Sequence, residues 1–189
     1  VFGALLAGFI LGCLWWIAYV PDTSARMIHG IPANATFVSV HDNLAERWTE
    51  IAANPAVRAA LSVAGVSDED IEETIGDPEL ATWIRRLASG PACLAYVPHA
   101  GLHGDEAWIL VTWIGNYERR FRWLLSLGLI DDVQRLDGSG AAATWVYTGD
   151  DVPAGQLTFA LSRGTLIACY SKDTQIPELV RSGILHHRA

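Results

Sequence analysis

The sequence has few of the residues that mark a covalent scaffold or a nucleic-acid binder. Only three of its 189 residues are Cys, too few for a disulfide-rich domain. Thirteen Lys and Arg stand against twenty-one Asp and Glu, which gives a formal net charge of -8. A nucleic-acid binder needs a basic face, so this balance argues against nucleic acid as a partner. No charged residue precedes Asp22, so the chain begins with one long uncharged stretch.

The uncharged stretch 1–20 reads VFGALLAGFILGCLWWIAYV. As a helix that rises 1.5 Å per residue, it is about 30 Å long, which matches the hydrocarbon layer of a bilayer. Trp15, Trp16 and Tyr19 lie at one end, where amphipathic rings favour the head-group zone. A cleaved signal peptide would have a shorter apolar region and a small-residue cleavage site. We therefore predict a transmembrane helix over 1–20.

The predicted helix carries small residues at every fourth position, namely Ala4, Gly8 and Gly12. Such a face lets helices approach closely in lipid, so it predicts contact with another helix. The flank after the helix has Asp22 and Arg26 but no basic cluster, as is typical of a translocated side. We expect a single-pass protein of the bacterial inner membrane with its main domain in the periplasm. The sequence begins with Val, so we also expect residues upstream.

Residues 21–35 are predicted to be a linker, 36–183 an α+β domain with a mostly antiparallel sheet and helices packed on one face, and 184–189 a tail. The segments 38–47 and 111–120 are similar: each has a strand, an Asn that can cap a helix, and Arg in the first helical turns. This similarity suggests two strand–helix repeats, 36–90 and 92–183. It is also explained by the cap chemistry that such junctions share.

Strands are expected where β-branched and aromatic residues run between turn residues, and helices where caps precede an apolar period of three to four residues. The expected strands are 36–41, 92–97, 106–114, 133–136, 144–147, 156–161 and 165–170. The expected helices follow Asn43, Pro55, Ser67, Pro78, Asn116 and Pro177.

No arrangement of residues predicts catalysis, a metal site or a cofactor. The motif G-x-S-x-G is absent, and the only Lys is Lys172, so the sequence has no phosphate-binding loop ending in Lys. His99 and His103 have the spacing of metal ligands on a helix, but Pro98 and the nearby glycines predict a hairpin tip instead. Cys93 and Cys169 lie in predicted strands and can form a disulfide only if those strands are neighbours.

Candidate partner contacts come from aromatic and basic residues. Trp108 and Trp113 are an odd number of positions apart in one predicted strand, so they face opposite sides of the sheet. Arg119, Arg120 and Arg122 follow on the next predicted helix. Exposed aromatics beside Arg favour a protein interface.

Three pieces carry a resemblance to uncharacterised bacterial envelope proteins that have one N-terminal span and an extracytoplasmic α+β domain. They are the apolar segment 1–20, the stretch Ile31–Val40, and the strand–turn–strand Phe159–Ala168. The resemblance implies the same layout for this chain and brings no catalytic residues with it.

Our main hypothesis is a non-catalytic, membrane-anchored accessory or scaffold subunit of a larger complex, for which a respiratory or photosynthetic assembly is a plausible host. Its partners are then the lipid bilayer and other membrane-protein subunits. The alternative is a periplasmic binding module for an apolar or lipid ligand, which predicts a closed apolar cavity of about a few hundred Å³.

Overall fold

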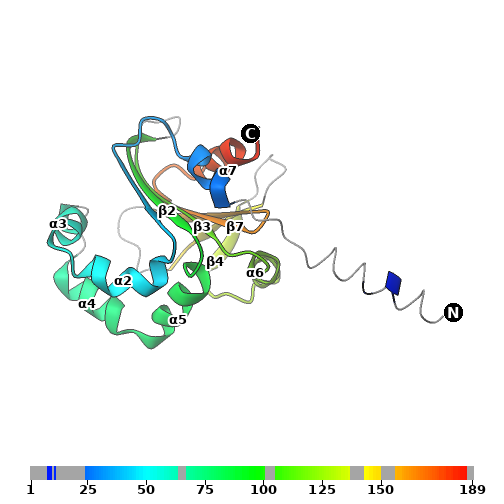
Figure 1. Ribbon diagram of the computed structural model, residues 1–189, viewed down its shortest axis with the longest axis horizontal. Helices are drawn as coiled ribbons and strands as arrows, with labels where there is room; N and C mark the ends of the chain where they lie inside the picture. The colour runs from blue at the N-terminus through cyan, green and yellow to red at the C-terminus, as the bar shows by residue number, and fades with distance from the viewer. Residues whose placement is uncertain are drawn as a thin grey trace.

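A seven-stranded antiparallel sheet forms the centre of the chain (Figure 1). The computed structural model describes residues 8, 9, 11, 24–63, 67–100, 105–136, 143–149 and 156–186. The strand order is β1-β2-β3-β7-β6-β5-β4. The strands are β1 (Phe37–His41), β2 (Ala92–Ala100), β3 (Asp105–Trp113), β4 (Val133–Leu136), β5 (Thr144–Tyr147), β6 (Gln156–Ser162) and β7 (Thr165–Ser171). The expected α+β class with an antiparallel sheet is confirmed.

Helices cover both faces of this sheet, so the expectation of helices on one face was wrong. Two elements lie on one face, the 3₁₀ helix η1 (Ser24–Gly30) and α7 (Ile176–His186). The other face carries α2 (Leu44–Ala52), α5 (Pro78–Leu87) and α6 (Tyr117–Ser126), and the short helices α3 (Pro55–Val63) and α4 (Asp68–Gly76) pack beside α2 and α5. The central strands are apolar on both faces and need cover on each.

The face under η1 and α7 holds the largest buried cluster. Ile176, Val180 and Ile184 recur every four residues, so all three point from α7 to the sheet, and Met27 of η1 is buried beside them. Two predicted boundaries are thereby corrected. The predicted linker 21–35 contains the packed helix η1, and the predicted tail 184–189 begins inside α7, where Ile184 is only 4% exposed. Apolar residues at these positions are too few to reveal a helix by their period alone.

Two glycines let η1 and α7 touch backbone to backbone. A Cβ at Gly30 would lie 2.6 Å from Ile184 Cγ1 and 2.7 Å from the Val180 carbonyl oxygen. A Cβ at Gly183 would lie 3.0 Å from the His29 carbonyl oxygen. No side chain fits between the two helices at these points.

Replacing Gly30 with Ala should therefore push η1 away from α7. We expect the free energy of unfolding to fall by about 1–3 kcal/mol, as in other overpacked sites. Urea denaturation of the full chain in detergent measures this. The matched control is Gly76→Ala, because a Cβ at Gly76 meets nothing within 4 Å. Equal stabilities of the two variants would contradict the packing described here.

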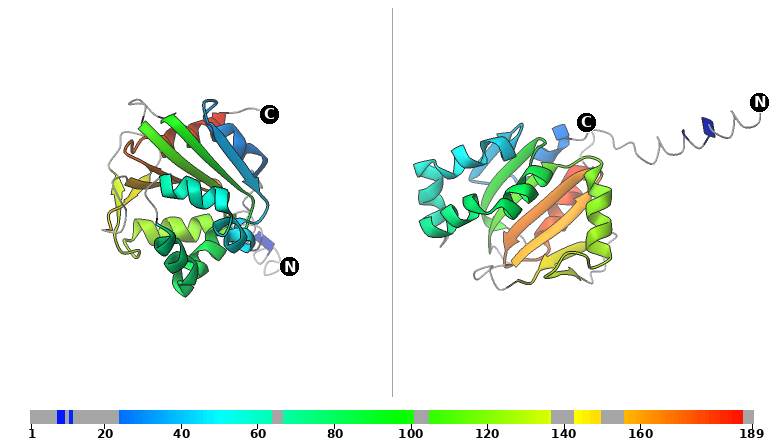
Figure 2. Two further views of the ribbon diagram at one scale, coloured as in Figure 1. Left: turned by 90° about the vertical axis from the view of Figure 1, so that its left-hand side faces the viewer. Right: turned by 90° about the horizontal axis from the view of Figure 1, so that it is seen from below.

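The second face has two smaller clusters, one under α6 and one under α2 and α5. Figure 2 shows α6 lying apart from the group formed by α2 to α5. Phe121 and Leu125 of α6 pack on Trp145 and Leu161, and Trp83 of α5 meets Phe121 edge to face with ring centroids 6.1 Å apart. Leu44, Ala88 and Ala92 form the centre of the cluster under α2 and α5. These helices are thus tied to the sheet and to one another by apolar contacts.

The two similar strand–helix junctions differ in their caps. The Asn43 side chain accepts a hydrogen bond from the Glu46 N–H at 3.2 Å, as predicted for a helix cap. Asn116 makes no such bond, because its backbone is already helical (φ -63, ψ -19). There the Gly164 carbonyl accepts hydrogen bonds from the N–H groups of Ile114 and Gly115 instead. The two predicted repeats, 36–90 and 92–183, belong to one sheet, in which β1 of the first repeat pairs with β2 of the second.

Across the described part of the chain, none of the helices is both long and apolar enough to traverse a bilayer. Of the predicted span 1–20, only Gly8, Phe9 and Leu11 are among the described residues.

Candidate interaction surfaces and a basic cleft

Most of the residues predicted to act in the membrane lie outside the described residues. They are Ala4, Gly12, Trp15, Trp16 and Tyr19. Gly8 is described and exposed, and a Cβ added to it would have nothing within 4 Å. The packing and interface roles of these six residues stay predictions.

Trp108 and Trp113 do face opposite sides of β3. Trp113 packs against the cluster under η1 and α7. Trp108 lies half-buried on the other face, 5.0 Å from the Tyr96 ring centroid and 6.4 Å from that of Phe37. These rings form one cross-strand row over β1, β2 and β3, because Phe37 pairs with Tyr96 and Tyr96 with Trp108.

An acidic side chain borders this aromatic row. Glu106 precedes Trp108 by two residues on β3, so it lies on the same face. Burial raises the pKa of the Tyr96 phenol, and the charge and hydrogen bond of the Glu106 carboxylate raise it further. Tyr96 therefore stays a neutral donor toward Glu106 over the ordinary pH range.

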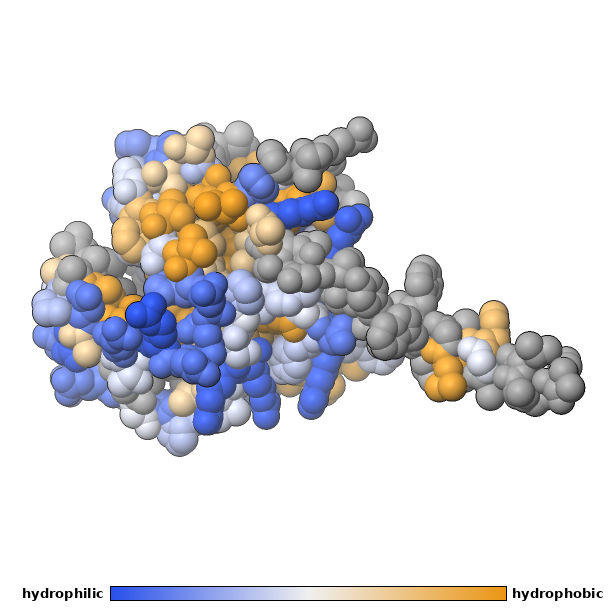
Figure 3. Space-filling model, in the orientation of Figure 1, coloured by the Kyte–Doolittle hydropathy of each residue, from blue (hydrophilic) through white to orange (hydrophobic). Residues whose placement is uncertain are grey.

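The outer edge of the sheet at β1 is apolar and exposed (Figure 3). Val40 is 61% exposed and Val38 44%, on the face under η1 and α7, and Phe37 is exposed on the opposite face of the strand. Ile28 of η1 is also exposed. We call these four residues the β1 patch. Exposed edges are commonly protected by Lys, Pro or a bulge, and β1 (FVSVH) has neither Lys nor Pro. The sequence predicted this strand, but local alternation of residues does not reveal which strand ends a sheet.

Helix α6 carries a second exposed apolar group. Trp123 is 68% exposed and Leu127, which follows the helix, is 63% exposed. Arg119 precedes Trp123 by four residues and is exposed, as is Arg120, which lies 6.0 Å above the Tyr117 ring. Arg119 and Arg120 are thus exposed, and their role as partner contacts stays a prediction. Trp123 was not among the predicted contacts, because its spacing from the other apolar residues does not distinguish an outer face from a buried one.

Arg122 is bonded within its own chain, although its side chain stays 43% exposed, and its role as a partner contact stays a prediction. Its Nε donates to Glu118 Oε1 at 2.9 Å, and a second nitrogen of the guanidinium bonds to the same oxygen. The guanidinium also donates to the Leu161 carbonyl oxygen at 3.2 Å. Glu118 is buried one turn earlier on α6, so it needs this cation.

Replacing Arg122 with Met should leave the Glu118 carboxylate buried without its cation. We expect a loss of stability on the order of 2 kcal/mol, less than for a fully buried pair because Arg122 is partly exposed. Arg119→Met is the matched control on the same helix and should stay within about 0.5 kcal/mol of the parent. Thermal unfolding of both variants measures the change in stability. Equal losses of stability in the two variants would refute the role of Arg122 as the partner of Glu118.

Cys93 and Cys169 are both free thiols in the buried cluster under η1 and α7. Cys93 pairs with Val111 and Cys169 with Ile109, so β3 lies between the two cysteine strands. Two strand spacings amount to about 10 Å, which is beyond the reach of a disulfide. The condition for a Cys93–Cys169 bridge, neighbouring strands, is not met.

Both thiols should resist alkylation by a maleimide in the folded chain. Burial raises the pKa of each thiol, so little reactive thiolate forms. After denaturation without a reductant, both should react fully, as peptide mass spectrometry would show. A disulfide-linked peptide that contains both residues would contradict this arrangement of strands.

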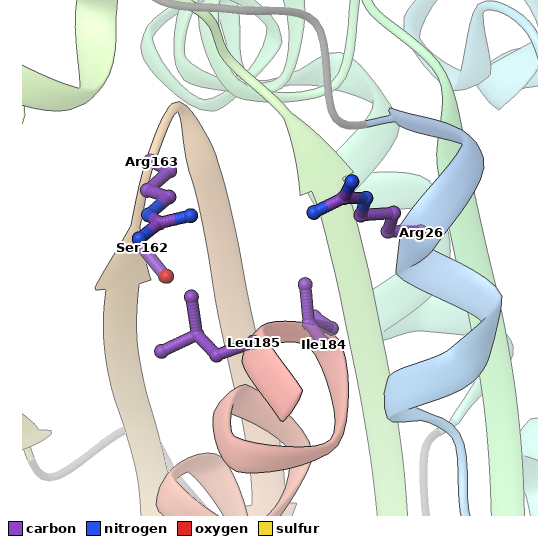
Figure 4. A pocket seen from close by; sticks show the side chains of 5 residues that line it. All are labelled: Arg26, Ser162, Arg163, Ile184 and Leu185. Carbon is purple, nitrogen blue, oxygen red and sulfur yellow. The ribbon is translucent and has the colours of Figure 1, made fainter. Parts of the chain in front are cut away.

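A small cleft lies where the chain enters the domain (Figure 4). Its described lining is Arg26 of η1, Ser162 and Arg163 at the β6–β7 turn, and Ile184 and Leu185 of α7. Its volume is about 10 Å³, room for roughly one water molecule. Sequence patterns did not predict this cleft, because Arg26 and Arg163 are far apart in the chain and only the fold brings them together.

The histidine pair considered as a metal site is not assembled by the described residues. His99 is exposed, and its carbonyl oxygen accepts a hydrogen bond from Asn34 Nδ2 at 2.6 Å. His103 lies outside the described residues. Among the residues that the structure describes, no group of three or more His, Cys, Asp or Glu side chains is arranged to hold a metal ion.

Comparisons of this chain with protein-family models, with curated proteins and with solved structures found no match.

Proposed function

We propose that this protein is a non-catalytic accessory subunit, anchored in the bacterial inner membrane by one helix, whose periplasmic domain packs on partner subunits of a larger complex. The observation that carries the proposal is the β1 patch. Its apolar side chains and the open edge of β1 remain in contact with water in the isolated chain. Large exposed apolar patches mark interaction sites on soluble domains.

The β1 patch suits an extended segment of a partner. A strand added to β1 would satisfy the backbone groups of the sheet edge and cover Val38 and Val40 on one face. Phe37 would be covered on the other face, where it already meets Trp108. An edge without Lys or Pro has nothing to prevent such pairing.

Helix α6 supports the same proposal through exposed aromatic and basic side chains instead of an open strand edge. Trp and Arg are the residues that contribute most to protein interfaces, and α6 exposes Trp123 beside Arg119 and Arg120. A partner surface with carboxylates around an apolar pocket would complement it. A respiratory or photosynthetic assembly remains a plausible host.

The alternative, a binding module for an apolar or lipid ligand, receives less support. Such a module needs an enclosed apolar cavity of about a few hundred Å³. The cleft found in the described part of the chain has about 10 Å³ and two guanidinium groups in its lining.

A charged residue at the sheet edge should break the proposed interface. Val40→Lys places an ammonium at the most exposed apolar position of β1, where strand addition would bury it. We expect the domain to fold normally and the partner subunits to be lost during purification in mild detergent. Leu179→Lys on α7 is the matched control, because Leu179 is 52% exposed but lies outside both surfaces.

A photo-crosslinking residue at position 40 or 179 makes the test independent of purification. Crosslinks in native membranes should form from position 40 to one or a few membrane subunits, in constant proportion to this chain. Position 179 should give none. A chain that always purifies alone and forms no crosslink from position 40 would refute the proposal.

A further inference from the structure

The two edges of the sheet differ in how well they are protected. Strand β4 ends the strand order on one side, has only four residues and carries the exposed Arg135. A short edge strand with a charge resists the addition of another strand. Strand β1 ends the order on the other side and pairs with β2 alone among the described strands. Its five residues, FVSVH, include no Asp, Glu, Lys or Arg, so this edge is open to a further strand.

The sequence of β1 reads almost the same in both directions. Ser39 is its centre, a valine lies on either side of Ser39, and a residue with a planar ring forms each end. A second β1 strand can therefore run antiparallel to the first with Ser39 opposite Ser39. Val38 then lies opposite Val40 of the other copy, and Phe37 lies opposite His41. Each side chain meets one of similar kind, which an interface between two identical surfaces requires.

This pairing would cover the exposed side chains on both faces of the strand. Val38 and Val40 are 44% and 61% exposed and lie on the face of η1 and α7. Between two copies they would form one group of four valines on that face. Phe37 is 47% exposed on the opposite face, where it would gain the imidazole ring of His41 as a neighbour. The exposed apolar residues of the edge are thus the ones that pairing buries.

Charge favours an antiparallel arrangement of the two copies. The chain has a formal net charge of -8, so two copies repel each other, and an uncharged edge is where they can approach. The exposed Asp42 directly follows β1, and Thr36 directly precedes it. Antiparallel pairing about Ser39 places each Asp42 opposite the neutral Thr36 of the other copy. Parallel pairing in register would place the two Asp42 residues side by side, and like charges at such positions are destabilising.

The same symmetry allows two anchors in one membrane. Opposite residues of a strand pair point to the same face, so the face that carries η1 in one copy continues into the η1 face of the other. Helix η1 lies on that face together with α7 (Figure 1). Only residues 21–23 separate the predicted span 1–20 from Ser24, the start of η1. Both spans would therefore leave the joined sheet from one face, as two copies in one bilayer require.

We propose that β1 pairs antiparallel with β1 of a second copy of this chain, centred on Ser39, so that the two sheets become one continuous sheet. The inference rests on the proposed function, because it names the partner at the β1 patch and uses the membrane anchor to fix the symmetry. A closed pair results instead of a filament, since the β4 edge of each sheet is protected. Helix α6 packs on the β4 and β6 side of the sheet, so it stays free for the other subunits.

Cysteine substitutions along β1 test the register in the full chain. Each variant also carries Cys13→Ser, which leaves Cys93 and Cys169, both buried, as the native thiols. Opposite residues of an antiparallel pair have Cα atoms about 4.5–5.5 Å apart, within the range of a disulfide. In membranes treated with a mild oxidant, Ser39→Cys should therefore form a disulfide-linked dimer on a non-reducing gel. Val38→Cys should form little, because its equivalent in the other copy lies diagonally, about 7–8 Å away.

Mixed copies make the test specific for this register. Val38→Cys and Val40→Cys chains with different tags are produced together in one cell. Disulfides between the two tags should be about tenfold more abundant than those of either variant with itself, because only the mixed pair has Cα atoms within disulfide range. Leu179→Cys, exposed on α7, is the control for random collisions. Equal dimer fractions at positions 38, 39 and 179 would overturn the proposal.

The size of the chain without added cysteines gives an independent measure. In a mild detergent, sedimentation should show a dimer for the parent and for Leu179→Lys. It should show a monomer for Val40→Lys, because pairing would bring the two new ammonium groups together at the sheet edge. Circular dichroism confirms that both variants fold. A folded parent chain that stays monomeric, or a Val40→Lys chain that stays dimeric, would also overturn the proposal.

The outcomes separate this inference from the proposed function. If position 40 crosslinks to other subunits and never to a second copy, the accessory-subunit proposal stands and the pairing of two copies is overturned. If two copies pair through β1 and no other subunit is found, the pairing stands and the proposal of a larger complex fails.

Discussion

The pairing of β3 with β7 is the contact on which the rest of the molecule depends. Every other pairing in the sheet joins strands that are consecutive in the chain, which gives the orders β1-β2-β3 and β7-β6-β5-β4. Seven residue pairs, from Ala107–Ser171 to Trp113–Thr165, join these two halves. Ile109, Val111, Ile167 and Cys169 are fully buried along this ladder. This ladder joins the two halves of the sheet, and the buried cluster under η1 and α7 contains residues of both halves.

The sequence predicted where the helices and strands lie, but it did not predict which of their faces are covered by other elements. Apolar alternation and turn residues placed both ends of all seven strands within three residues, and the Asn43 cap and Pro78 placed two helices. The cover of the second face was missed, since η1 lies in the predicted linker and Ile184 of α7 lies in the predicted tail. Continuous apolar character in β3 and β7 was the signal that both faces are covered.

The candidate surfaces illustrate the same limit. Arg119 and Arg120 could be singled out from the sequence, but Arg122 on the same helix turns inward to Glu118. The partner of a charged side chain depends on helix phase and on a strand that lies 39 residues away. The edge position of β1 and the meeting of Arg26 with Arg163 are products of strand order, which local patterns do not contain.

The contact of η1 with α7 also brings the two ends of the described domain together. Leu185, near the end of α7, shares a cleft with Arg26, near the start of η1. A domain whose two ends lie close together at the surface tolerates insertion into another protein, because the linkers that connect its ends run outside the fold. Such a module can be transplanted into a loop of an unrelated protein, or rejoined end to end, with its sheet left intact.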